Sequence, residues 1–171
     1  MHHLKTSCLL LLLFCLSPAA ATENNRFVYT PYKPQKVVFD FYFDEPAKIN
    51  SALYWIRSYL NPLLEEPYSY VPEEMEIIVI IHGTEIVTTV KKNRHKYKDT
   101  VARMKYYADF GVKYKVCGLV MDEYGYKPAD FLDFVEVVPS AITELAHWQS
   151  LGYAVIRPTI LQKKSAIEDI R

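Results

Sequence analysis

The stretch EIIVIIHG, at residues 76–83, is the most strand-like segment of the chain and indicates its fold class. Consecutive apolar residues, most of them β-branched, are typical of a strand that is covered on both faces. The run VVFDFYF at residues 37–43 has the same character. Because strands covered on both faces are a feature of parallel sheets, we expect both segments inside such a sheet.

Helical patterns alternate with the strand-like segments along the chain. Apolar residues at helical spacing follow residue 46, and Asn61 with Pro62 is expected to end that helix. Further helices are expected at residues 86–95, 100–110, 119–124 and 140–152, and further strands at residues 112–116, 135–138 and 153–156. This alternation, without a tight Asn-Gly or Asp-Gly hairpin, predicts a three-layer α/β/α domain around a mostly parallel sheet of about five strands.

The first 21 residues have the layout of a secretory signal peptide that is cleaved after Ala21. Their apolar run is much shorter than the roughly 20 residues of a membrane span. A lipoprotein signal ending at Cys15 is the alternative, and bulky Phe14 argues against it. We expect a periplasmic or secreted protein with four parts: a signal peptide at residues 1–21, an N-terminal arm at 22–35, an α/β domain at 36–158 and a polar tail at 159–171.

The charge balance indicates which partners to expect. The chain carries 20 basic and 20 acidic side chains, and loss of Lys5 with the leader leaves a net charge of −1. A near-neutral chain without a basic patch gives no support for nucleic-acid binding or for binding to an anionic membrane surface. We therefore expect neither nucleic acid nor, after cleavage, a membrane as a partner.

Cys117 would be the sole thiol of the mature chain, because Cys8 and Cys15 lie in the leader. A single cysteine in an exported protein is buried, reactive or paired with another chain. Cys117 follows a predicted strand and precedes a predicted helix, a position where parallel α/β proteins gather chemistry and where exposed amide groups favour a thiolate. Free cysteine is also among the most buried residue types, so a purely structural role stays open.

His82 follows another predicted strand and is expected at the same edge of the sheet. Its imidazole could accept the thiol proton, orient a substrate or ligate a metal, or it could simply satisfy a backbone carbonyl. Gly83 and Gly118 directly follow the two residues and are predicted to permit a tight turn or the close approach of a ligand. A metal site needs more ligands than these, and none has a recognisable spacing, so we expect no metal.

Several familiar motifs are absent from the sequence. There is no G-x-G-x-x-G, no Walker lysine loop, no G-x-S-x-G and no C-x-x-C. We expect no bound cofactor. A chain with one thiol also cannot run a dithiol–disulfide cycle by itself, because the resolving thiol must come from a partner or a small molecule.

Four stretches, in this order and spacing, resemble the DsrE/DsrF-like superfamily of small α/β proteins linked to sulfur relay and sulfur oxidation. They are KVVFDFYFDEPAKINSALYWIRSYL at residues 36–60, EIIVIIHG at 76–83, GVKYKVCG at 111–118 and VEVVPSAITELAHWQSLGYAVIRP at 135–158. The resemblance implies homo-oligomers, often trimers or hexamers, and a first strand that lies between the second and the third. In relay members the cysteine matched by Cys117 carries sulfur as a persulfide, which implies a carrier role for Cys117 with His82 nearby. That strand order would start the two residues about 10 Å apart, two strand spacings.

Three functional hypotheses follow from these residues. The leading one is an exported, oligomeric protein that uses Cys117 in thiol or sulfane-sulfur chemistry, as a sulfurtransferase-like carrier with a small sulfur compound or thiol partner. The alternative is a non-enzymatic module of the same fold whose strand-end pocket holds a small ligand or takes part in assembly. A metal-binding protein using His82 and Cys117 is the third.

Overall fold

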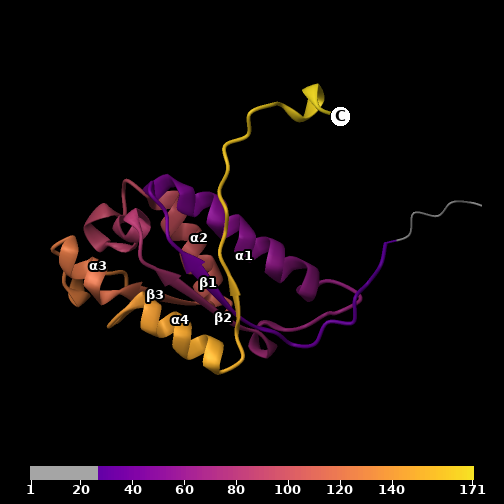
Figure 1. Cartoon of the computed structure of the whole chain (residues 1–171), viewed down its shortest axis with the longest axis horizontal. Coiled ribbons are helices and arrows are strands. Elements are labelled where there is room, and N and C mark those ends of the chain that lie inside the picture. The colour runs from indigo at the N-terminus through magenta and orange to yellow at the C-terminus, as the bar shows by residue number, and fades with distance from the viewer. Residues whose placement is uncertain (1–26) are drawn as a thin grey trace, which may run out of the picture. The chain divides into compact units, whose positions relative to one another are not determined.

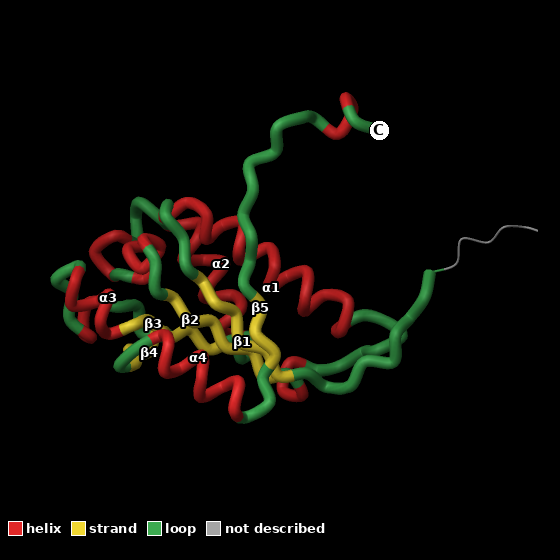
Figure 2. The backbone as a smooth tube through the Cα atoms, in the orientation of Figure 1, coloured by secondary structure: helices red, strands yellow, loops and turns green. Residues whose placement is uncertain are grey.

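The computed structural model of the protein describes residues 27–171, and the predicted signal peptide lies outside the described residues. This part of the chain contains a five-stranded sheet in the order β4-β3-β2-β1-β5 (Figure 1, Figure 2). Its strands are β1 (Lys36–Phe41), β2 (Glu76–Ile81), β3 (Lys113–Cys117), β4 (Val135–Val138) and β5 (Ala154–Ile156). All four neighbouring pairs are parallel, which confirms the predicted fold class.

Helices cover both faces of the sheet, as Figure 1 shows. The α-helices are α1 (Ile49–Leu64), α2 (Lys98–Asp109), α3 (Gly118–Glu123) and α4 (Ala141–Ser150), and 3-10 segments lie at Pro46–Lys48, Pro72–Glu74, Thr84–Thr89, Lys91–Asn93, Pro128–Asp130 and Ile167–Asp169. None of the helices in residues 27–171 combines the length and the apolar character that spanning a membrane requires.

The core is divided between the two faces of the sheet. Alternate strand residues such as Phe39 and Val79 pack in a large cluster with α1 and α2. The intervening residues, including Val38 and Ile80, form a smaller cluster with α4, and Cys117 belongs to this smaller cluster. Burying a large apolar side chain stabilises a fold by about 1.5–3 kcal/mol, so these clusters provide most of the driving force for folding.

The strand order corrects one expectation that was drawn from the resemblance. The resemblance implied that β1 lies between β2 and β3, whereas in the structure β2 lies between β1 and β3 and pairs with both. The two crossovers through α1 and α2 run in the same direction and place both helices on one face, because parallel crossovers are right-handed. The crossover through α4 returns over the opposite face and places β5 beside β1.

Two helix boundaries also differ from the sequence prediction. α1 continues through Pro62 to Leu64, because Leu63 is buried and the Glu65 amide donates a hydrogen bond to the Asn61 carbonyl. The segment expected as one helix at residues 86–95 is instead two 3-10 turns. There the hydroxyls of Thr88 and Thr89 donate to carbonyls three residues earlier, at 2.8 and 2.6 Å, which competes with regular α-helical bonding.

Candidate functional site

Four polar or thiol-bearing residues form a row along the carboxyl-terminal edge of the sheet. Arg157 follows β5, Asp40 lies in β1, His82 follows β2, and Cys117 ends β3. Because β5, β1, β2 and β3 are consecutive neighbours, the row has one residue on each of four adjacent strands. Residue alternation places all four on the α4 face, where Cys117 packs. We call these residues the strand-end row.

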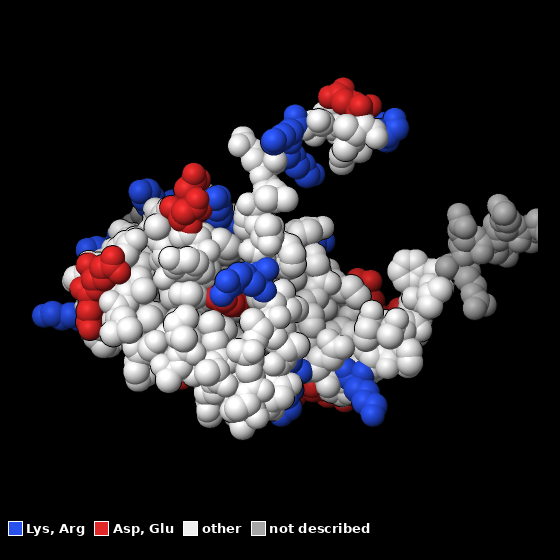
Figure 3. All heavy atoms as spheres, in the orientation of Figure 1, with Lys and Arg blue, Asp and Glu red and all other residues white. Residues whose placement is uncertain are grey.

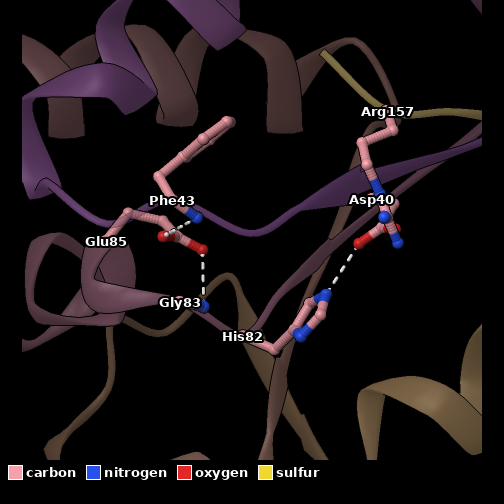
Figure 4. Close-up of polar contacts among 6 residues, drawn as sticks. All are labelled: Asp40, Phe43, His82, Gly83, Glu85 and Arg157. Carbon is pink, nitrogen blue, oxygen red and sulfur yellow. Dashed lines mark hydrogen bonds and ion pairs between the residues drawn. The ribbon is translucent and has the colours of Figure 1, made fainter. Parts of the chain in front are cut away.

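Asp40 is the centre of the row. It is only 1 % exposed, and its Oδ1 lies 2.6 Å from His82 Nε2. Its Oδ2 accepts a hydrogen bond from Arg157 Nε at 2.7 Å and a second one from an Nη group of Arg157 (Figure 4). Burial raises the pKa of Asp40, but the hydrogen bonds and charges of His82 and Arg157 outweigh burial and hold that pKa below its ordinary value. The buried carboxyl is therefore ionised at neutral pH.

This carboxylate fixes the orientation of the His82 ring. An ionised Asp40 can only accept, so His82 Nε2 carries the proton of that hydrogen bond. The lone pair is then left on Nδ1, which becomes the basic nitrogen of the ring. The His82 ring also stacks on Tyr42, with centroids 4.8 Å apart and planes 18° from parallel. The arrangement is that of a carboxylate-oriented imidazole, which is suited to accepting a proton.

Cys117 is a free, buried thiol that is 4 % exposed. Ile81 of β2 is paired with Val116 of β3, so His82 and Cys117 follow side by side on neighbouring strands. They are separated by one strand spacing of about 4.8 Å rather than by the two that the sequence analysis expected. Within the described residues no hydrogen bond joins the thiol to His82. Chemistry at this sulfur therefore requires a local opening of the structure around it.

Lys115, two residues before the thiol, already has partners of its own. Its Nζ donates to Glu136 on β4 at 2.6 Å and lies 5.9 Å from the centre of the Trp148 ring. The Lys115 charge is thus paired with Glu136, and no hydrogen bond joins it to the thiol within the described residues.

A pocket of about 240 Å³ opens beside His82. It is lined by the segment that follows β1, the segment that follows β2 and helix α3: Tyr42, Phe43, Asp44, His82, Gly83, Thr84, Val120, Glu123 and Tyr124. Cys117 is not among these residues. The imidazole therefore lines the pocket, whereas the thiol belongs to the smaller core cluster.

Glu85 connects two of the segments that line the pocket. Its buried carboxylate accepts a hydrogen bond from the Phe43 amide at 3.0 Å and another from the Gly83 amide at 2.9 Å (Figure 4). Burial raises the pKa of Glu85, although both backbone amides act in the opposite direction. The carboxylate joins the residues after β1 to those after β2 and so sets the shape of the pocket.

Both predicted ligand-contacting glycines lie where a larger side chain does not fit. A Cβ on Gly83 would collide with the Phe43 backbone and the Glu85 carboxylate, and one on Gly118 would lie 2.9 Å from the Val138 carbonyl. Gly83 lines the pocket, whereas Gly118 packs against the end of β4. Ligand contact by either glycine stays a prediction.

No group of three or more His, Cys, Asp or Glu side chains within residues 27–171 is arranged to hold a metal ion. The residues that the sequence analysis missed are Asp40, Arg157 and Glu85. Asp40 had a signal of its own, since it is the single charged residue in the strand-like run at residues 37–43. Arg157 and Glu85 had none, because their roles depend on contacts with residues 117 and 42 positions away.

The parallel sheet and the row at its carboxyl-terminal edge define a small α/β protein with a candidate thiol–imidazole site. The chain belongs to the DsrE/DsrF-like family, whose family model matches residues 35–158. Among solved structures, the chain is similar to MTH1491, a protein of unknown function from Methanobacterium thermoautotrophicum. The TM-score is 0.58 at 21 % identity, over 72 % of this chain and 99 % of the other, which is a likeness of fold. A comparison with curated proteins gave no match.

Proposed function

We propose that this protein accepts and passes on sulfane sulfur at Cys117, with His82 as the proton acceptor and Asp40 as its orienting partner. The observation that carries the proposal is the register of β2 and β3, in which Cys117 directly neighbours an imidazole oriented by a carboxylate. Membership of the DsrE/DsrF-like family supports the same chemistry. Nucleophile, base and orienting acid are the three parts of an activated cysteine site.

The proposed step is a transfer between two thiols. His82 Nδ1 takes the proton of the Cys117 thiol, and the thiolate attacks the outer sulfur of a small persulfide, R–S–SH. A new S–S bond forms on Cys117 as the old one breaks, and the leaving thiolate takes up the proton held by His82. The products are a Cys117 persulfide and R–SH, so the step needs no external oxidant or reductant.

The buried thiol of Cys117 must become accessible for this step. Cys117 directly precedes α3, a helix of six residues in which only Met121 is buried. An element with so few buried contacts is expected to open at a lower free-energy cost than the central strands. Movement of α3 would expose Cys117 toward the pocket beside His82, because Val120, Glu123 and Tyr124 of that pocket belong to or border the same helix.

The test is persulfide loading followed by intact-mass spectrometry. The folded protein, mixed with glutathione persulfide, should gain one sulfur atom, about 32 Da, that a reductant removes and peptide mapping assigns to Cys117. Cys117→Ala should gain none. His82→Gln, whose amide can still donate to Asp40, should load at least about 100-fold more slowly, since it lacks the base. Equal loading of His82→Gln and the parent protein would remove His82 from the mechanism.

A second candidate function is favoured by the pocket itself. His82 lines the pocket and the buried Cys117 does not, as expected of a binding module that holds a small polar ligand without using the thiol. The variants Cys117→Ala and His82→Gln distinguish the two candidate functions. Ligand binding that survives Cys117→Ala and is lost in His82→Gln would favour the binding module, and loss of sulfur loading in both variants favours sulfur transfer.

We also propose that the protein is exported and assembles into a homo-oligomer. The leader-like residues 1–21 support export, and family resemblance supports a trimer or hexamer. Amino-terminal sequencing of the protein from its native host should begin at Thr22, and sedimentation of that material should give a multiple of the chain mass. A start at Met1 would contradict export, and a monomer at all concentrations would contradict assembly.

A further inference from the structure

A second cavity lies along α2 and shares no lining residue with the pocket beside His82. Its volume of about 750 Å³ is within the range of about 300–1,000 Å³ that small-ligand sites occupy. One wall is a single stripe of α2, whose members follow helical spacing: Lys98, Val101, Ala102, Lys105, Tyr106 and Asp109. The other wall is residues 132–134, and Arg94 lies before the first turn of the helix. We call this cavity the α2 groove.

The middle of the α2 groove is apolar. Val101 and Leu132 are buried, and Phe134, two residues after Leu132, is partly buried against the core. Tyr106 is 57 % exposed and packs in a tilted arrangement against Phe110, so its ring forms a wall rather than part of the core. The groove thus offers an apolar surface that nothing covers in the described part of the chain.

Some charged side chains of the groove have ion-pair partners and others have none. Lys105 is paired with Asp109, and Asp133 is paired with Lys91 at 2.8 Å. Arg94 and Lys98 form no ion pair within residues 27–171, although Arg94, after the stronger effect of Lys91, helps to lower the pKa of Asp133. Two cations with no ion-pair partner therefore lie at the end of the groove where α2 begins. The helix dipole also favours an anion at that end.

From this arrangement we propose that the α2 groove binds an amphiphilic monoanion, a carboxylate attached to an apolar chain. The carboxylate lies between Arg94 and Lys98, and the apolar chain runs along Val101, Ala102 and Tyr106. The twelve residues of α2 extend about 18 Å, so a medium-length acyl chain fits along the helix. This site is independent of the sulfur chemistry proposed for Cys117, since no group of the strand-end row takes part in it.

The experiment is calorimetric titration of the folded protein with decanoate, with decan-1-ol as the neutral probe of equal chain length. Decanoate should bind at about one equivalent, at least about tenfold more tightly than the alcohol, because a carboxylate gains charge-assisted hydrogen bonds. Arg94→Ala combined with Lys98→Ala should weaken decanoate binding at least about tenfold and leave the alcohol unchanged. Arg57→Ala, an exposed cation on α1, is the matched control and should bind decanoate like the parent protein.

A second variant tests the apolar part of the groove. Ala102 is exposed and lines the middle of the groove, so Ala102→Glu should block both probes without disturbing the core. Circular dichroism and the thermal midpoint identify any variant that fails to fold. Absence of saturable decanoate binding up to about 1 mM would overturn the proposal. Equal affinity for decanoate and decan-1-ol, or unchanged decanoate binding in the Arg94/Lys98 double variant, would overturn it as well.

Discussion

Asp40 accepts a hydrogen bond from His82 at 2.6 Å although its carboxyl group is almost completely buried. A buried carboxylate is stable only when it is paired and hydrogen-bonded, and here the Arg157 charge and the hydrogen bond from His82 stabilise it. Asp40 and His82 come from the neighbouring strands β1 and β2, so the sheet itself sets the position of the imidazole. Acidic and basic side chains elsewhere are interspersed with broad uncharged areas on the face that Figure 3 shows. The carboxylates of the other Lys and Arg ion pairs in residues 27–171 are exposed, so a carboxylate that is both buried and compensated is a feature of the strand ends.

Asp40→Asn should destabilise the protein and slow sulfur loading at Cys117. Asparagine cannot balance the Arg157 charge, and its amide has one acceptor where the carboxylate has two. Loss of charged hydrogen bonds costs about 1–3 kcal/mol, and the mostly exposed Arg157 keeps the value in the lower part of that range because water screens it. Chemical denaturation checks the stability, and the loading rate of folded protein checks the orienting role. Arg57→Ala is a control for loss of one surface charge.

The stability lost in Asp40→Asn should depend on pH. The pKa of Asp40 is lowered in the folded protein, so its contribution is present above the unfolded value of about 3.9 and is lost as the pH falls through the folded pKa. The difference in unfolding free energy between the parent protein and Asp40→Asn should thus shrink below about pH 4. Taking this difference cancels the opposite trend of Glu85, whose pKa is raised by burial. A difference that stays constant from pH 7 to about pH 3 would contradict a compensated Asp40 charge.

Gly83→Ala should destabilise the protein more than an ordinary glycine substitution. The added methyl group would meet the Phe43 backbone and the Glu85 carboxylate, which are both held by hydrogen bonds. Overpacking of this kind typically costs about 1–3 kcal/mol, and loss of the Glu85 contacts adds to it. Gly125→Ala is the matched control, because its positive φ of 67° costs only about 1 kcal/mol and its Cβ would be in open space. In thermal unfolding, the midpoint temperature of Gly83→Ala should be clearly lower than that of Gly125→Ala.

The stability of Cys117 variants should depend on the polarity of the new side chain rather than on its size. Its neighbours in the smaller core cluster include Val38, Ile80 and Leu145, none of which offers a side-chain hydrogen-bond partner. Cys117→Ser buries a hydroxyl there, at a cost of about 1–3 kcal/mol when it is unsatisfied, whereas Cys117→Ala only loses a small volume. Denaturant midpoints should rank Cys117→Ala above Cys117→Ser. The reverse order would indicate that the thiol lies in a polar, hydrated environment.

The sequence predicted that His82 and Cys117 lie at strand ends, but it did not predict which strands are neighbours in the sheet. The apolar run before His82 and the alternating strand-like segment before Cys117 were sufficient to place both residues at strand ends. The strand order was not predictable in this way, because it depends on the direction of each crossover and not on residue periodicity. The expectation of two strand spacings between the residues was wrong for this reason. Arg157 illustrates the same limit, since its partner Asp40 lies 117 positions earlier in the chain.

The reactivity of Cys117 in the folded protein tests the central claim most directly. The measurement is the rate of alkylation of Cys117 by iodoacetamide, followed by peptide mass spectrometry, in folded protein and in urea-unfolded protein at equal pH. The account predicts that Cys117 of the folded protein is alkylated through local opening of α3, faster than global unfolding of the chain would allow, and that His82→Gln slows this reaction, because the oriented imidazole increases the thiolate fraction. Protection of Cys117 until the protein unfolds would contradict the account and would leave the thiol as a part of the core.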